Sequence, residues 1–257
     1  MVLVFVGAIT VIYFLSPEYA QKWPFDEGKT SAVNLPAGYK YIKLNDGLVW
    51  SKVEEGVRKA QGLSFESSNI TISPSDSVSG NVIRLSESLV KYLNVSTEAD
   101  TLCIKLSAPE EQIRQDFKKH EYIDLVTDIQ LNLLPEVQDI NVVSNCLISL
   151  EGIRNDSLSI TSQGKVRVIN CQIKEFTPIV KGLYMVSGDI ENLYLDLSKC
   201  YTWEVEDDCH IYREVLSSDR HQRISLEKHC KIVEWTPKTD EAYMNIEIKK
   251  KAKIILE

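Results

Sequence analysis

From Leu63 onward the sequence is dominated by short runs in which apolar and polar residues alternate. A period of two places every second side chain on the same face, so each run predicts a half-buried β-strand. The clearest runs are 70–72, 82–85, 102–106, 129–131 and 158–160. One helix is predicted among them, over 109–120, where proline and two glutamates begin the segment and two lysines end it. The sequence therefore predicts an all-β body.

Three segments align on a cysteine, and this internal repeat narrows the expected fold. In each segment an alternating strand precedes the cysteine, a glutamate follows at +4 and a large apolar residue follows at +5. The cysteines are Cys171, Cys200 and Cys230, which are 29 and then 30 residues apart, and Cys146 lies 25 residues upstream of Cys171. Short strands repeating at this length must stack to bury their apolar faces. We therefore expect a β-solenoid in which the aligned cysteines lie above one another.

A leucine-rich-repeat-like solenoid is the alternative fold. Residues 137–147 fit the template L-x-x-L-x-L-x-x-N-x-L, with Val137, Ile140 and Val142 in its apolar positions and Asn145 in its asparagine position. The following segments do not continue the template, and their connections are turn-like, without the helical or leucine-bearing backs of that family.

The stretch 81–106, NVIRLSESLVKYLNVSTEADTLCIKL, resembles the opening of the bacterial GIN domain, the auto-transporter adhesin head family. The segments 158–164 and 183–189 are similar to the short strands with a following glycine that come next in that family. The resemblance covers residues 60–257 and departs from the family in its many cysteines and in lacking repeated Gly-Ser-Gly turns. It implies a single-stranded right-handed β-helix, exported from the cytoplasm of a Gram-negative bacterium, with no established enzymatic activity.

Residues 2–15 are apolar throughout, interrupted only by Gly7 and Thr10. As a helix they would rise about 21 Å, which is short of a hydrocarbon core about 30 Å thick. No Lys or Arg precedes this run and no small-x-small site follows it, which argues against cleavage. We expect an N-terminal hydrophobic helix within 1–20 that acts as a membrane anchor; a cleaved signal and a buried core segment remain alternatives. The resemblance favours a body outside the cytoplasm.

The rest of the chain divides into two expected parts. Residues 21–60 contain several prolines and glycines among charges and aromatics, which predicts a tether with a short strand over 39–44. Helical spacing of Val49, Trp50, Val53 and Val57 predicts a short juxtamembrane amphipathic helix at the end of that tether. Residues 61–257 are expected to form the β-helix domain.

Composition limits the partners and the redox chemistry. The net charge of −8 argues against a nucleic-acid ligand, because such proteins neutralise phosphates with a basic patch. Buried free thiols are the favoured state of the cysteines, with a Cys200–Cys209 disulfide as the alternative in an oxidising compartment. No Cys-x-x-Cys occurs, so redox catalysis is not expected. The six cysteines are Cys103, Cys146, Cys171, Cys200, Cys209 and Cys230.

No residue is assigned a catalytic, cofactor-binding or metal-binding role. His210, His221 and His229 beside Cys209 and Cys230 are the one plausible metal group, but adjacent Cys-His side chains point to opposite faces of a strand. Asp207 and Asp208 are expected in a solvated turn between strands, with the acid and base of a polysaccharide hydrolase or lyase as the alternative. Lysines within 249–253 are expected to protect the edge of a last strand, although they could also contact an anionic lipid or polysaccharide.

These observations lead to two functional hypotheses. The first is a non-enzymatic, membrane-anchored, adhesin-like or scaffold protein of the cell envelope, in the periplasm or at the cell surface, that binds a glycan or protein. The second is a carbohydrate-binding or carbohydrate-active protein, which would need exposed aromatic rings beside carboxylates. The candidate rings are Tyr184, Tyr194, Tyr201 and Trp203.

Overall fold

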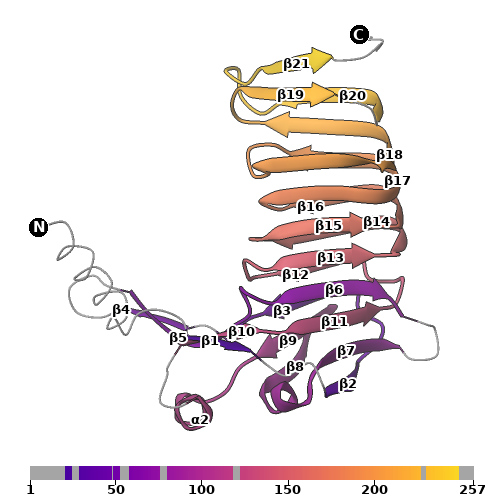
Figure 1. Cartoon of the computed structure of the whole chain (residues 1–257). Helices are drawn as coiled ribbons and strands as arrows, with labels where there is room; N and C mark the ends of the chain where they lie inside the picture. The colour runs from indigo at the N-terminus through magenta and orange to yellow at the C-terminus, as the bar shows by residue number, and fades with distance from the viewer. Residues whose placement is uncertain are drawn as a thin grey trace, which may run out of the picture.

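The computed structural model describes residues 21–24, 29–47, 49–52, 58–75, 80–117, 122–226 and 230–248. Within these ranges the chain consists almost entirely of β-strands, which lie across the molecule in a tall stack (Figure 1). The helices described there are the 3₁₀ helix η1 (Glu87–Tyr92) and the α-helix α2 (Glu110–Asp116). Neither combines the length and the apolar character that crossing a bilayer requires.

Fifteen strands form one large sheet, and thirteen of them follow one another along a single hydrogen-bonded path. In path order these are β2 (Thr30–Leu35), β7 (Asn81–Ser86), β11 (Asp128–Leu133), β6 (Asn69–Pro74), β13 (Leu147–Glu151), β15 (Lys165–Ile169), β17 (Gly182–Asp196), β16 (Cys171–Ile179), β14 (Arg154–Ser162), β12 (Asp139–Val142), β3 (Tyr41–Asn45), β9 (Thr101–Leu106) and β8 (Leu93–Glu98). Two further strands, β18 (Thr202–Ser218) and β20 (Cys230–Pro237), continue the sheet from β17.

The sheet turns back on itself at β17. The beginning of β17 pairs with β15, with Leu183 opposite Val166, while its later part pairs with β16, with Leu193 opposite Phe176. The path therefore has a first limb, β11–β6–β13–β15, and a second limb, β16–β14–β12–β3. At the far ends of the path, η1 contacts β2 and β7 on one side and β9 on the other, so the sheet is nearly closed.

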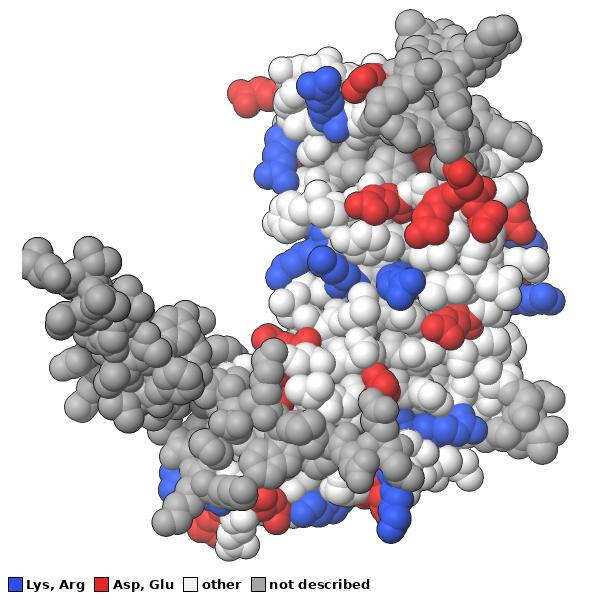
Figure 2. All heavy atoms as spheres, viewed as in Figure 1, with Lys and Arg blue, Asp and Glu red and all other residues white. Residues whose placement is uncertain are grey.

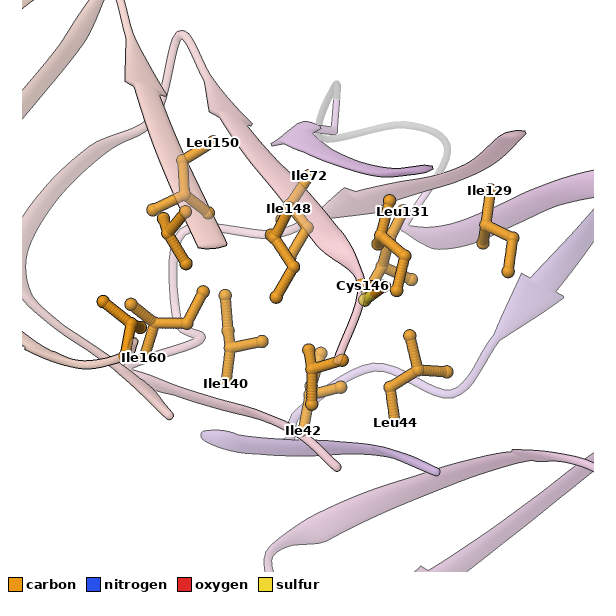
Figure 3. Close-up of a cluster of buried hydrophobic side chains, with 14 of the residues drawn as sticks. Ile42, Leu44, Ile72, Ile129, Leu131, Ile140, Cys146, Ile148, Leu150 and Ile160 are labelled. Atoms are coloured by element: carbon orange, nitrogen blue, oxygen red, sulfur yellow. The ribbon is translucent and has the colours of Figure 1, made fainter. Parts of the chain in front are cut away.

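The hydrophobic core lies between the two limbs (Figure 3). Ile72, Ile148 and Leu150 of the first limb point toward Ile140 and Ile160 of the second limb. Each of these side chains is at most 1% exposed, because alternation along each strand directs every second residue inward. Parallel register then places apolar residues in rows across neighbouring strands. One such row contains Leu131, Ile72, Leu150, Val168 and Met185.

The predicted single-stranded right-handed β-helix is wrong. The strands instead form one nearly closed, barrel-like sheet of mixed orientation, in which β7 pairs antiparallel with both β2 and β11, and β8 pairs antiparallel with β9. The leucine-rich-repeat-like alternative is wrong for the same reason. Alternation identifies strands but does not encode which strands pair, so it could not distinguish this sheet from a solenoid. The expected N-terminal hydrophobic helix, over 1–20, lies outside the described residues.

The predicted cysteine ladder is also wrong. Cys171 pairs with Gly188, which in turn pairs with Cys209, whereas Cys230 pairs with Ile211. Cys200 lies in the turn between β17 and β18. Successive partners are 17, 21 and 19 residues apart, so the spacing of 29 and 30 residues does not correspond to a structural unit.

Two smaller sheets complete the described part of the chain. One has the order β1 (Gln21–Pro24), β10 (Tyr122–Val126), β5 (Arg58–Ser64) and β4 (Val49–Lys52), and the other pairs β19 (Gln222–Leu226) with β21 (Met244–Ile248). The helix predicted around Val49 is therefore wrong for 49–52, and 53–57 lie outside the described residues. The expected tether, 21–60, contributes strands to two sheets, and its predicted boundaries stay a prediction.

Candidate ligand-binding surface

Aromatic side chains gather where three successive turns stack at one corner of the molecule. The side-chain amide of Gln222 donates to the carbonyl of Leu197 at 3.3 Å, and the backbone amide of Gln222 donates to the carbonyl of Tyr243 at 2.9 Å. The hydroxyl of Thr239 donates to the carbonyl of Asp219 at 2.9 Å. These bonds hold the turn after β17, the turn after β18 and the turn after β20 beside one another.

We define the aromatic corner as Tyr201, Arg220, His221, Tyr243 and Asn245. The guanidinium carbon of Arg220 lies 5.9 Å from the ring centre of Tyr201, within cation–π range. The rings of His221 and Tyr243 stack with centres 4.2 Å apart, and Asn245 Nδ2 lies 3.1 Å from His221 Nε2. The corner therefore consists of two contacting groups, Tyr201 with Arg220 and His221 with Tyr243 and Asn245, which adjoin because Arg220 and His221 are consecutive in the chain.

The aromatic corner is open to solvent. Tyr201 is 67% exposed and Tyr243 is 56% exposed, the largest exposures among the large hydrophobic residues whose side chains are described. Within the described part of the chain, the guanidinium of Arg220 forms one hydrogen bond, a 3.4 Å contact with the carbonyl of Ser198, so most of its donors stay available. Exposed tyrosine and arginine are the residue types that most often carry binding energy at protein surfaces. The corner is thus a candidate binding surface.

Of the four aromatic residues singled out in the sequence, Tyr201 alone belongs to this corner. Trp203 is half-buried and packs against the core. The ring of Tyr184 lies over Gly182 and under the ammonium of Lys165, which is 5.7 Å from the ring centre. Tyr194 bonds to Glu175, and this bond raises the pKa of the tyrosine hydroxyl. Arg220, Tyr243 and Asn245 were not identified from the sequence, because they lie in turns or at strand ends that share no motif.

Asp207 and Asp208 lie inside β18, and the prediction of a turn between strands is wrong. They are exposed at an irregularity in the pairing of β17 with β18, near the position where Ser187 lies opposite Asp208. Other exposed carboxylates of β18 lie nearby, at Glu204 and Glu206, and Figure 2 shows acidic side chains gathered at this level of the stack. These four carboxylates are therefore exposed side chains of one strand.

The possible metal group does not assemble in the described part of the chain. Cys209 is fully buried, whereas the neighbouring His210 is exposed and lies opposite Asp189. His221 is engaged with Tyr243 and Asn245, while His229 lies outside the described residues, as does the side chain of Cys230. Among the residues described, no three His, Cys, Asp or Glu side chains form a metal-binding group.

The five cysteines with described side chains are all free thiols, so the alternative Cys200–Cys209 disulfide is not formed. Burial raises the pKa of Cys146 and Cys209 to about 12 and that of Cys200 to about 11. Burial also raises the pKa of Cys171. These thiols are therefore protonated at neutral pH and act as small apolar side chains.

Comparison with known proteins identifies related folds. No family model and no curated protein matches the chain. A candidate adhesin from Bacteroides fragilis matches with a TM-score of 0.53 and 12% identity, covering 88% of this chain and 99% of its own. A candidate lipid-binding protein from Parabacteroides distasonis matches with a TM-score of 0.41 and 15% identity, covering 90% of this chain and 98% of its own. A candidate adhesin from Parabacteroides merdae matches with a TM-score of 0.38 and 12% identity, covering 90% of this chain and 100% of its own. At a TM-score of 0.53, this chain shares its fold with the Bacteroides fragilis protein.

Proposed function

We propose that this chain is a non-enzymatic, adhesin-like binding protein of the bacterial cell envelope and that its aromatic corner binds a glycan. The observation that carries the proposal is the exposure of two tyrosines, Tyr201 beside the guanidinium of Arg220 and Tyr243 stacked on the adjacent His221. Exposing two large rings in water is unfavourable, and a ligand that covers them recovers this free energy.

A glycan suits the chemistry of the corner. Tyrosine combines an apolar ring with a hydroxyl, so it can contact the C–H face of a sugar and also bond to a sugar hydroxyl. Arg220 and Asn245 add donors at the edge of the rings, and Arg220 can form a paired hydrogen bond with the carboxylate of an acidic sugar. The corner is a surface on stacked turns, which leaves room for a long polymer to cross it.

The assignment to the envelope rests on two supports. The chain shares its fold with a candidate adhesin from Bacteroides fragilis. The apolar run 2–15 supplies a segment that could attach the body to a membrane, although it lies outside the described residues. Membrane anchoring by this run is therefore part of the proposal. The non-enzymatic assignment is supported by the exposed position of Asp207 and Asp208, the acid and base candidates.

Binding of the full chain to a mucin-coated surface tests this function. We expect binding that falls at least tenfold in the double variant Tyr201→Ala, Tyr243→Ala and several-fold in Arg220→Gln. Tyr41→Ala is the matched control, because Tyr41 is 43% exposed on β3 in the second limb and should leave binding unchanged.

Removing the glycans from the mucin identifies the ligand. Loss of binding after enzymatic deglycosylation supports a glycan. Binding that survives deglycosylation shows that the corner recognises polypeptide, and it overturns the glycan assignment. Equal binding by the corner variants and the wild-type chain overturns the aromatic corner as the site.

A further inference from the structure

A pocket of about 250 Å³ lies between the two limbs, at the ends of β6 and β11 and the beginnings of β12 and β14. We call it the limb pocket. Leu133 closes it on the side of the first limb, while Ile140 and Leu158 close it on the side of the second limb. Val137 and Ile153 come from the connections that run between the limbs at this edge. The pocket is therefore an opening into the core.

The walls of the limb pocket are fixed by packing. The five apolar side chains named above are each at most 9% exposed, and all belong to the main hydrophobic core. Asn155 Nδ2 donates to the carbonyl of Val137 at 2.7 Å, which ties the beginning of β14 to the connection before β12. A site held in this way is largely formed before a ligand arrives.

Water fills such a space poorly. A volume of about 250 Å³ would accommodate about eight water molecules at about 30 Å³ each, and each would need two to four polar partners. The lining offers few, because its walls are mostly apolar and the amide of Asn155 already bonds to the carbonyl of Val137. An engineered apolar cavity of about 150 Å³ stays dry and binds benzene. The limb pocket is larger and is open to solvent at its mouth, so an apolar ligand can reach its apolar walls and displace water from them.

Arg154 is an exposed residue of the lining, and it adds a positive charge at the edge of this apolar space. Within the described part of the chain its guanidinium forms no hydrogen bond or ion pair. The neighbouring carboxylate of Asp156 is instead paired with Lys174 at 2.7 Å. A guanidinium presents parallel donors that match the two oxygens of a carboxylate. An apolar pocket with an exposed arginine in its lining is complementary to a chain that is apolar at one end and carries a carboxylate at the other.

We propose that the limb pocket binds a short aliphatic carboxylate, with the hydrocarbon between the limbs and the carboxylate on Arg154. The volume is below the range of about 300–1,000 Å³ typical of drug-sized ligands. It therefore suits a short chain, or the end of a longer acyl chain. This site is separate from the aromatic corner and does not depend on the function proposed for it.

Titration of the ¹⁵N-labelled full chain with octanoate, followed by NMR, tests the site. We expect saturable shifts concentrated at the amides of Gly152, Ile153 and Leu134, which lie in the lining. Octanol and octylamine are the matched probes, because they keep the hydrocarbon and replace the carboxylate with a neutral or a positive group. We expect octanoate to bind about tenfold more tightly than octanol, and octylamine to bind more weakly than either.

Three variants make the test specific. Arg154→Gln should lower the affinity for octanoate about tenfold and leave the affinity for octanol unchanged. Arg167→Gln is the control, because Arg167 is an exposed arginine on β15 outside the lining. Leu134 is half-buried in the lining, so Leu134→Trp should fill the mouth of the pocket and lower the affinity for both octanoate and octanol. Thermal unfolding of this variant will show whether it is folded.

The outcomes separate clearly. The pocket is not a ligand site if octanoate shifts amide resonances outside the lining, or if no probe produces saturable shifts. If octanoate and octanol bind with equal affinity, and Arg154→Gln changes neither affinity, then the site does not recognise a carboxylate through Arg154. That result overturns this part of the proposal. Tighter binding of octylamine also overturns the proposal, because it would show that Glu136 or Glu151 nearby dominates the charge at the mouth. The mucin-binding experiment tests the aromatic corner alone, so neither of its results changes how these outcomes are interpreted.

Discussion

Cys171 and Cys209 lie in one row of the sheet with only Gly188 between them. A Cβ atom at Gly188 would lie 2.2 Å from the carbonyl oxygen of Cys171, which is far inside van der Waals contact. Gly188 also has a φ of +124°, a conformation that residues with a side chain rarely adopt. The row therefore brings the backbones of three strands together at a position where no side chain fits.

Gly188→Ala should lower the free energy of unfolding by about 2–4 kcal/mol, because it combines a backbone clash with an unfavourable φ. Gly38→Ala is the matched control. Gly38 has a φ of +85° but nothing within 4 Å of its added Cβ, so it should cost only about 1 kcal/mol. Urea unfolding of both variants measures the difference. Equal losses would show that the contact with Cys171 does not constrain the row.

The buried thiols should resist modification in the folded protein. Cys146, Cys171, Cys200 and Cys209 are each at most 5% exposed, and a thiol must ionise to react. At pH 8 we expect iodoacetamide to label these four sites at least 100-fold more slowly in the native chain than in urea. Partly exposed Cys103 serves as the internal reference for labelling without unfolding. Mass spectrometry of peptides gives the rate at each site, and fast native labelling of Cys209 would contradict its burial.

Alkaline pH should destabilise the fold. Burial raises the pKa of Cys146 and Cys209 from 9.0 to about 12, and burial together with the bond to Asp116 raises that of Tyr92 from 10.0 to about 12. Between pH 9 and 12 the unfolded chain loses these protons while the folded chain keeps them, so stability falls as pH rises. Each fully ionising group contributes up to about 1.4 kcal/mol per pH unit. The free energy of unfolding should be lower at pH 10.5 than at pH 8, and a flat profile would contradict the pKa shifts.

Tyr92→Phe should reduce stability by about 1–2 kcal/mol. The hydroxyl of Tyr92 donates to Asp116 Oδ2 at 2.7 Å, which joins η1 to α2, and the ring is buried against Phe117. Phenylalanine keeps the ring but leaves the carboxylate without this donor. Lys91→Gln is the control, since the Lys91–Asp116 pair at 2.8 Å is exposed and should contribute under about 1 kcal/mol. Urea unfolding measures the stability of both variants. If Lys91→Gln lowers the free energy of unfolding more than Tyr92→Phe does, the Lys91–Asp116 pair stabilises this junction more than the Tyr92 hydrogen bond does.

Alternation in the sequence identified individual strands well. The runs at 70–72, 82–85, 102–106, 129–131 and 158–160 all lie in strands, and the predicted helix at 109–120 contains α2. These predictions succeed because burial of one face is a local property that appears in the residues themselves. The predicted short strand over 39–44 is likewise found as β3.

Pairing could not be inferred in the same way. The segments around Cys171 and Cys200 look alike, yet one begins β16 and the other lies in a turn. Which strand lies beside another depends on turn lengths and on contacts between distant residues, and a local pattern contains neither. The aromatic corner was missed for a related reason, since Tyr201, His221 and Tyr243 are spaced unequally in the sequence. The limb pocket arises from the meeting of two limbs, which no single segment predicts.

The position of β3 has a consequence for the order in which the chain can fold during its synthesis. Tyr41 pairs with Thr101 of β9 on one side and with Asp139 of β12 on the other, so both neighbours of β3 are made later. By contrast, β16, β17 and β18 pair with strands that lie close to them in the sequence. A ribosome must therefore deliver about a hundred further residues before β3 is enclosed, and until then its apolar face depends on chaperones or transient contacts for protection.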